Sequence, residues 1–273
     1  LPPEQFAKLQ KELPGEVFTT RTLATYSYEL NNKKAPFDNV NVRKALNLSL
    51  DRNVITDKVL GQGQTPTYVF TPTYIEEGHL IQQPAYSKEP MAQRNEEAIK
   101  LLEEAGYSKA NPLKFTILYN TNENHKKVAI AAASMWKANT KGLIDVKLEN
   151  QEWKTYIDSR RAGRYDAARA GWNADYNQAT TFGNYFLSNS SNNTAKYANP
   201  EYDKAIAESY VATDAEGRAK AYAKAEEILA KDFGIVPIFN YVNPRLVKPY
   251  VKGYSGKDPQ DHIYLRNLYI IKH

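Results

Sequence analysis

The sequence predicts an α/β fold in which a mixed sheet is flanked by helices. Between residues 95 and 172, segments with helical periodicity alternate with short segments rich in β-branched and aromatic residues, which is typical of strand–helix–strand units. The composition is that of a globular protein, because 42% of the 273 residues are hydrophobic and 25% are charged. A chain of this length can bury a substantial core.

The first elements lie before this alternating region. Residues 17–30 are rich in β-branched and aromatic side chains and predict a strand. Residues 41–60 predict two helices that separate near Ser49, with Asp51 as the N-cap of the second helix. A long loop with several prolines follows over 65–90, and loops of this length are usually functional or held by another domain.

The remaining elements follow in chain order. Residues 95–105 predict an amphipathic helix, because their apolar side chains recur at helical spacing. The later helices are expected at 123–141, 153–161, 200–211 and 214–231. The later strands are expected at 113–119, 144–148, 165–172, 235–242, 245–251 and 267–271.

Composition argues against several classes of site. The chain has no cysteine, which excludes disulfides and thiolate metal sites, and its four histidines are far apart, so we predict no metal site. The 36 basic and 31 acidic residues are interleaved, which indicates a solvated mixed surface rather than a nucleic-acid interface. Because the sequence begins at Leu1 without a signal segment, we expect that residues precede it in the complete protein.

The strongest candidate site lies within residues 151–178, where two tryptophans, four arginines and several carboxylates come together. Residues 172–177 follow an expected strand, and ligands of α/β proteins usually bind beyond the carboxyl ends of strands. Arg169 alternates with apolar neighbours, so we expect it to be partly buried and to need an anionic partner. Asp175 could be a helix N-cap or a charge partner.

Some residues of this segment also have a purely structural interpretation. By its spacing on a helix, Trp153 is more typical of a core residue than of a ligand shelf. Arg160, Arg161 and Arg164 are expected to form a solvated face.

Three classes of function remain open from these residues. A glycosidase would use two of the carboxylates Glu152, Asp158, Asp166 and Asp175. A nucleic-acid module would use the arginines on phosphates and the aromatic residues on bases. A binding protein for a zwitterion would use one cation and one anion to meet the opposite charges of the ligand. Of the three classes, only this one uses Arg169 together with Asp175.

Two long segments, Asn150–Thr155 and Tyr165–Tyr176, resemble the oligopeptide-binding proteins of peptide ABC transporters in Gram-negative bacteria, the OppA type within family 5 of the extracellular solute-binding proteins. Shorter similar segments run collinearly along the chain: Val42–Leu46, Arg94–Ala98, 119–121, 125–127 and 243–249. The similarity covers roughly the second half of the family's full chain.

The resemblance implies the C-terminal lobe of a two-lobed, type II-like periplasmic binding protein. Residues 24–242 would form this lobe, while 1–23 and 243–273 would belong to the N-terminal lobe. The implied protein is a monomeric receptor in the periplasm, not an enzyme, and it has no cofactor. It binds short peptides through their termini and main chain and passes them to a membrane permease. A murein-peptide or haem-binding relative is the alternative.

The resemblance also assigns roles to residues. Asp175 would pair with the peptide ammonium, and Arg169 and His125 would receive the carboxylates of short and longer peptides. The walls of the side-chain pockets would include Trp153, Trp172 and Arg160. Tyr241 and Arg245 would lie at the hinge and the cleft. Gly171 and Asn173 would hydrogen-bond the main chain of the peptide. Two cysteines that pair in some members correspond to Ala24 and Asn173, and both are absent here, as expected if the disulfide were lost as a unit.

Overall fold

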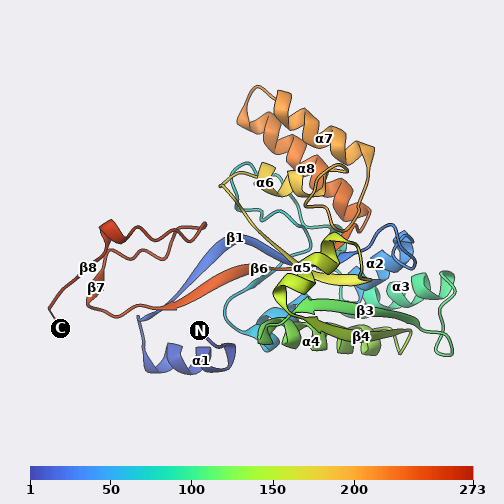
Figure 1. The fold of residues 1–273 in the computed structure, drawn as a ribbon, viewed down its shortest axis with the longest axis horizontal. Helices are drawn as coiled ribbons and strands as arrows, with labels where there is room; N and C mark the ends of the chain where they lie inside the picture. Colours follow the sequence, from blue (N-terminus) through green and yellow to red (C-terminus); the bar gives the residue numbers. More distant parts are fainter. Residues whose placement is uncertain (273) are drawn as a thin grey trace.

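The computed structural model describes residues 1–272 and contains a six-stranded mixed sheet with helices on both faces (Figure 1). The strand order is β2-β6-β1-β5-β3-β4. β3 is parallel to both β4 and β5, whereas β1 is antiparallel to β5 and β6. The predicted α/β class and the mixed sheet are therefore confirmed.

The strands of the main sheet are β1 (Val17–Leu30), β2 (Thr65–Pro66), β3 (Leu113–Asn120), β4 (Ile144–Gln151), β5 (Ala167–Asn173) and β6 (Ile235–Leu246), and a small second sheet contains β7 (Val251–Lys252) and β8 (Tyr269–Ile270). The α-helices are α1 (Pro3–Glu12), α2 (Val40–Leu48), α3 (Met91–Glu104), α4 (Glu123–Asn139), α5 (Trp153–Arg161), α6 (Thr180–Gly183), α7 (Pro200–Val211) and α8 (Ala215–Lys231). Short helical turns are η1 (Val54–Leu60), η2 (Ala85–Lys88), η3 (Asn184–Phe186) and η4 (Leu265–Asn267).

Several boundaries differ from the prediction and one cap is confirmed. The carboxylate of Asp51 accepts hydrogen bonds from the main-chain N–H groups of Asn53 and Val54, at 3.0 and 3.3 Å, as expected for an N-cap. α3 begins at Met91, because Pro90 cannot continue a helix toward the N-terminus. The expected strand over 245–251 is wrong, since β6 continues to Leu246 and β7 is a separate short strand.

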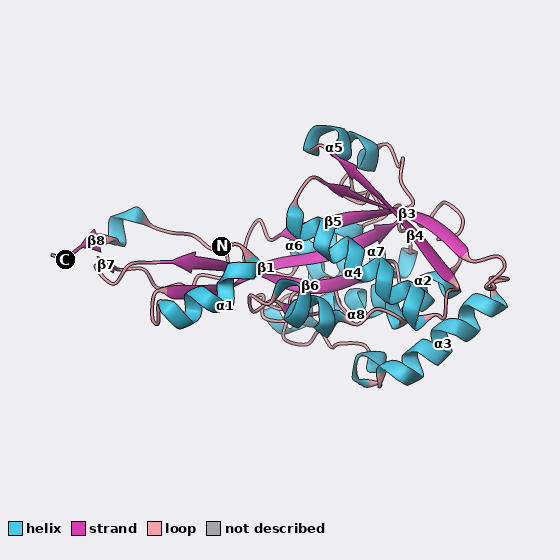
Figure 2. Ribbon diagram, turned by 90° about the horizontal axis from the view of Figure 1, so that it is seen from below, coloured by secondary structure: helices cyan, strands magenta, loops and turns pink. Residues whose placement is uncertain are grey.

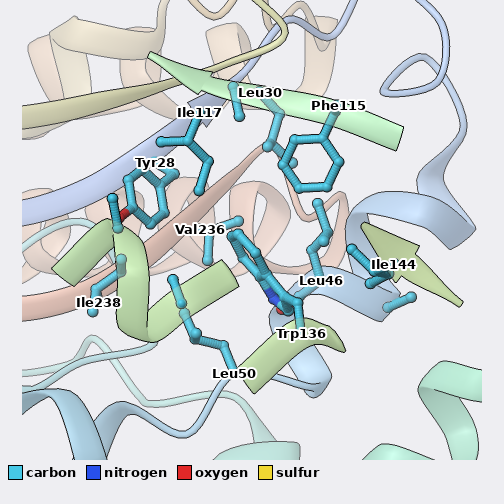
Figure 3. Packing of buried hydrophobic residues seen from close by; sticks show 14 of the residues in the cluster. Tyr28, Leu30, Leu46, Leu50, Phe115, Ile117, Trp136, Ile144, Val236 and Ile238 are labelled. Carbon is cyan, nitrogen blue, oxygen red and sulfur yellow. The ribbon is translucent and has the colours of Figure 1, made fainter. Parts of the chain in front are cut away.

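One face of the sheet is covered by α2 and α4. Trp136 of α4 lies at the centre of this core, fully buried beside Phe115 of β3 and Leu46 of α2 (Figure 3). The indole N–H of Trp136 donates to the main-chain oxygen of Leu46 at 2.9 Å, so the polar atom of this large side chain is satisfied.

The other face is covered by α6, α7 and α8 over one part and by α5 over another. Phe182, Ile206 and Leu229 belong to the cluster beneath α6–α8, and Tyr156 of α5 packs with Ala168 of β5 in a smaller cluster. Ala167 of β5 belongs to the core on the α2–α4 face and Ala168 to the cluster beneath α5, so the two faces of β5 contact different clusters.

α8 holds the long loop over 65–90. The fully buried carboxylate of Glu226 accepts hydrogen bonds from the main-chain N–H groups of Phe70 and Thr71 and from the Thr71 hydroxyl, the last at 2.7 Å. Arg218 and Glu77 add an ion pair at 2.6 Å. A helix therefore holds this loop, and the expectation that the loop is functional or held by another domain stays a prediction.

β1 and β6 extend beyond the body as a two-stranded ribbon, and β7 and β8 lie beyond its far end (Figures 1 and 2). The β1–β6 register shifts between Arg21 and Thr25, as at a β-bulge. The boundary predicted at 23/24 falls within this shift and the one at 242/243 lies just beyond it, although both strands continue through the region, so the division into lobes stays a prediction. No helix among the described residues is long and apolar enough to cross a bilayer.

Candidate binding cleft

A cleft of about 450 Å³ lies where β5 ends and the β1–β6 register shifts. Its lining residues include Leu23, Ala24, Arg169, Asn173, Tyr241 and Asp261. Three of the sequence-predicted site residues, Arg169, Asn173 and Tyr241, are therefore brought together. Ala24 and Asn173 are register partners across β1 and β5.

Strand alternation determines which side chains of β5 lie near Arg169. Successive residues of a strand point to opposite faces, so Arg169, Gly171 and Asn173 share one face and Trp172 lies on the other. A Cβ atom at Gly171 would lie 3.1 Å from Nη2 of Arg169 and 3.2 Å from the Tyr241 hydroxyl. Glycine at this position therefore leaves room for the arginine and the tyrosine to meet.

Arg169 is partly buried, as expected, but its partner is not an anion. Its Nη2 donates to the hydroxyl of Tyr241 at 2.5 Å, and its guanidinium lies 5.2 Å from the ring centroid of Tyr26. Its Nε is buried without a hydrogen-bond partner, and none of the ion pairs among the described residues includes it. No anion among the described residues partners Arg169, so the expected need for an anionic partner stays a prediction that an external anion could meet.

His125 lies beside this arginine. Asn122 caps α4 and accepts the main-chain N–H of His125 at 3.2 Å, which positions the histidine in the first turn of the helix. The imidazole lies 5.5 Å from the ring of Tyr26, and its Nδ1 is buried without a partner among the described residues. Burial, and then the charge of Arg169, lower the pKa of His125 to about 3, so the ring is neutral near pH 7.

Asp175 lies just past the end of β5 and is exposed. Its main-chain N–H donates to the Thr181 hydroxyl at 3.2 Å, while its carboxylate has no hydrogen bond or ion pair within residues 1–272. The N-cap of α6 is Ala179, so Asp175 is neither a helix cap nor the partner of Arg169. The helix-cap interpretation is therefore wrong, whereas the role of Asp175 as a charge partner stays a prediction.

The two tryptophans occupy the α5–α6 side of β5. Trp172 donates from its indole nitrogen to the Thr181 hydroxyl at 3.2 Å and packs edge-on against Tyr185, with ring centroids 5.0 Å apart. Trp153 begins α5, stacks on Tyr156 at 5.9 Å and is 52% exposed. The core interpretation of Trp153 is therefore wrong, because the first residue of this helix extends past the apolar face of the sheet.

Arg160 does not belong to a solvated face. It forms an ion pair with the fully buried carboxylate of Glu29 at 2.9 Å and donates to the hydroxyls of Tyr185 and Thr194, both at 3.1 Å. Arg161 is exposed, as predicted. Sequence reasoning missed Glu29, although a carboxylate inside an aromatic strand is a signal, since a buried charge requires a partner.

Arg245 is also paired. Its guanidinium forms a two-point ion pair with Asp261, with Nη2 to Oδ2 at 2.6 Å, and the amide of Asn243 donates to the same carboxylate. Asp261 lines the cleft and was missed by sequence reasoning, because a single aspartate in a long loop carries no distinguishing pattern.

The end of β5 also has an available main-chain edge. β3 pairs with β5 only at Ala167 and Ala168, while β1 pairs along the opposite side from Ala167 to Asn173. Residues 170–173 therefore lack a strand partner on the β3 side among the described residues. Such an edge can accept an extended peptide as an added strand.

Comparison with known proteins identifies relatives along the whole chain. Residues 1–194 match the family described as bacterial extracellular solute-binding proteins, family 5 Middle. The periplasmic oligopeptide-binding protein OppA of Haemophilus influenzae is 96% identical over 273 residues, which are 100% of this chain and 50% of that protein. The periplasmic murein peptide-binding protein MppA of Escherichia coli is 44% identical over 100% of the chain and 50% of its own length.

The fold agrees with these matches. The crystal structure of Haemophilus influenzae OppA in complex with RPPGFSPFR superposes with a TM-score of 0.94 and 95% identity, covering 100% of this chain and 53% of that one. The chain spans about half the length of the curated relatives that it matches. It belongs to family 5 of the bacterial extracellular solute-binding proteins.

Proposed function

We propose that this chain is the C-terminal lobe of a periplasmic receptor that binds short peptides for an ABC transporter. The observation that carries the proposal is Arg169, a partly buried cation without an anionic partner among the described residues, which lines a cleft beside an available strand edge. A buried charge is costly without a partner, and a ligand carboxylate would supply one.

A peptide would use groups that all peptides share. Its carboxylate would bind Arg169 or the neutral His125, and its main chain would pair with residues 170–173. Its ammonium would bind Asp175, whose carboxylate is exposed and accepts no hydrogen bond within the described chain. These contacts give affinity with little dependence on side-chain identity.

Side chains would lie between aromatic walls. Trp153 and Trp172 are on the same side of β5, and Arg160 lies behind them in its ion pair with Glu29. The exposed face of Trp153 offers apolar contact without a directional requirement.

The cleft lies at the register shift of β1 and β6, which we propose to be the hinge. Leu23 lies at the shift and, instead of continuing the β1–β6 ladder, donates its main-chain N–H to the oxygen of Pro259 at 2.8 Å. Closure of a second lobe would bury the ligand between the lobes. Arg245, fixed by Asp261, would line the closing side.

The alternative function, a carbohydrate-active enzyme, is disfavoured by the positions of two of its candidate carboxylates. Glu152 caps α5 by accepting the main-chain N–H of Lys154 at 3.0 Å, and Asp166 pairs with Lys34 at 2.6 Å. Neither lines the cleft. We therefore propose a receptor that is not an enzyme and requires no cofactor; a murein peptide or haem remains the alternative ligand, because relatives are named for both.

Calorimetry with tri- to pentapeptides tests this proposal, using the chain joined to the remaining half of the Haemophilus influenzae relative. Arg169→Met is expected to weaken binding by at least about tenfold, because a charge-assisted hydrogen bond contributes about 1.5–3 kcal/mol. N-acetylation of the peptide should remove the Asp175 contact. Arg161→Met, an exposed arginine outside the cleft, is the matched control, and equal losses in the two variants would contradict the proposal.

A further inference from the structure

A second hollow, of about 910 Å³, lies between α8 and the loop segment 80–89, with α2 and α3 closing one side. We call it the α8 groove. None of its described lining residues also lines the cleft. α2, α3 and α8 lie at the end of the molecule away from the β1–β6 ribbon (Figure 1), so the groove is separate from the proposed hinge. Its volume is that of a small-molecule site.

The loop and the helix run side by side along this groove. At one end, Nε2 of His79 lies 3.2 Å from the carboxylate of Glu216. At the other end, the rings of Tyr86 and Phe233 have centroids 5.8 Å apart. The residues of α8 that line the groove, at helical spacing, are Lys220, Ala223, Lys224, Glu227, Ala230 and Lys231. From the first to the last of these residues the helix rises about 16 Å, which sets the length of the α8 groove.

The floor of the groove is apolar. Leu48, Leu80, Pro84, Tyr86 and Phe233 contribute to it. Phe233 has φ +48°, a conformation that is unfavourable for a bulky side chain and that persists only where the surroundings impose it. This backbone places the aromatic ring against Tyr86 in the groove instead of within the main core.

Two groups of opposite charge lie at the ends of the groove: an exposed lysine without an ion pair and a carboxylate with a buried oxygen that has no partner among the described residues. The other lysines of the groove form ion pairs: Lys44 with Glu97, Lys224 with Glu208, and Lys231 with Glu227. Lys220, at the His79 end, forms none among the described residues. At the Tyr86 end, Oε2 of Glu89 is buried and has no hydrogen-bond partner within the described chain. A buried polar atom without a partner calls for a group that can donate to it.

We propose that the α8 groove binds an elongated amphiphile whose anionic group meets Lys220 and whose hydrocarbon body lies on Tyr86 and Phe233. A hydrogen-bond donor at the far end of the ligand would satisfy Glu89. A peptide suits this groove less well, because its main-chain amides would lie over an apolar floor without partners.

Calorimetry with dodecanoate and ω-hydroxydodecanoate, below their micelle concentrations, tests the proposal on the chain. We expect both acids to bind and the hydroxylated acid to bind about fivefold more tightly, because its hydroxyl can donate to Glu89. Lys220→Glu should weaken the binding of dodecanoate by about fivefold, because it reverses the charge of one partly exposed contact. Ala223→Trp should fill the α8 groove and abolish the binding of both acids while leaving the lysines in place.

Two controls make the result decisive. Lys204→Glu makes the same charge change on α7, away from the groove, and should leave the affinity unchanged. Thermal unfolding of each variant checks that the chain still folds. Equal losses in Lys220→Glu and Lys204→Glu, full binding by Ala223→Trp, or displacement of the acid by a peptide that occupies the cleft would each overturn the proposal.

Discussion

At the scale of single residues, the buried charged groups differ in where their partners are. Glu29 has its partner Arg160 within the chain, at 2.9 Å. Among the described residues, Arg169 has only the Tyr241 hydroxyl and the Tyr26 ring as partners. We attribute the first arrangement to stability and the second to ligand binding, because satisfied charges fix a fold while a cation without an anionic partner attracts one.

Glu29 can be tested by Glu29→Gln. The variant is expected to lose about 3–5 kcal/mol of unfolding free energy, because Arg160 would stay buried without its counter-charge. Urea denaturation measures this loss. Glu149→Gln, on an exposed carboxylate of β4, should change stability by less than about 0.5 kcal/mol. A Glu29→Gln, Arg160→Met double variant should recover part of the loss, and a simple sum of the two single effects would refute this pairing.

His125 predicts a pH dependence with a defined sign. Its pKa is about 3 in the folded chain, against an ordinary value of about 6.5 for histidine. Between these values the unfolded chain binds more protons, so the contribution of His125 to the unfolding free energy falls as the pH falls from about 6.5 toward about 3, by at most about 1.4 kcal/mol per pH unit.

The measurement compares the parent chain with His125→Gln by urea denaturation from pH 7 to pH 4.5. The parent should lose stability more steeply than the variant as the medium becomes acid. Parallel profiles would show that His125 titrates normally in the folded chain. The free energy at pH 7 serves as the reference for both proteins.

At the scale of elements, one carboxylate of α8 holds a long loop. Glu226→Gln would place an amide donor opposite the N–H groups of Phe70 and Thr71 and the Thr71 hydroxyl, so at least one of these contacts is lost. We expect faster amide hydrogen exchange at Phe70 and Thr71 and a decrease of about 1–3 kcal/mol in the free energy of unfolding. The neighbouring exposed Glu227 supplies the control, Glu227→Gln, which should leave exchange in this loop unchanged.

Local signals placed most elements correctly. Asp51 caps its helix, and the segments predicted between 113 and 172 are present as β3, α4, β4, α5 and β5. The boundaries that failed, at α3 and at the end of β6, depend on how far a segment continues against its neighbours. Pairing with β1 extends β6 to Leu246, and no local pattern carries that information.

At the scale of the whole molecule, apolar side chains remain exposed far from the core. Leu265 is 77% exposed, Ile270 69% and Tyr269 61%, all beyond the end of the β1–β6 ribbon. Exposed apolar clusters of this kind mark contact surfaces. Since the relatives are twice as long as the region matched, we predict that the remaining half covers these residues.

Adding the remaining half of the Haemophilus influenzae relative as a separate polypeptide tests this prediction. Amide exchange over 263–271 should slow, the unfolding temperature should rise, and peptide affinity should increase because both sides of the cleft are then present. Leu265→Asp should weaken the association of the two halves. Val211→Asp, at an exposed position on α7, is the control. Association that is equally weak in both variants would argue against this surface.

The sequence by itself determined the α/β class, the order of most elements and one of the segments that line the cleft, because periodicity and strand–helix alternation are local properties. Only the tertiary structure decided how individual charges are used. The local sequence predicts a solvated Arg160 and a partly buried Arg169, yet Arg160 meets the buried carboxylate of Glu29 from β1, whereas Arg169 meets a tyrosine from β6. The physical reason is that the free energy of a buried charge depends on partners brought near by distant strands, and that proximity is not encoded within any single segment.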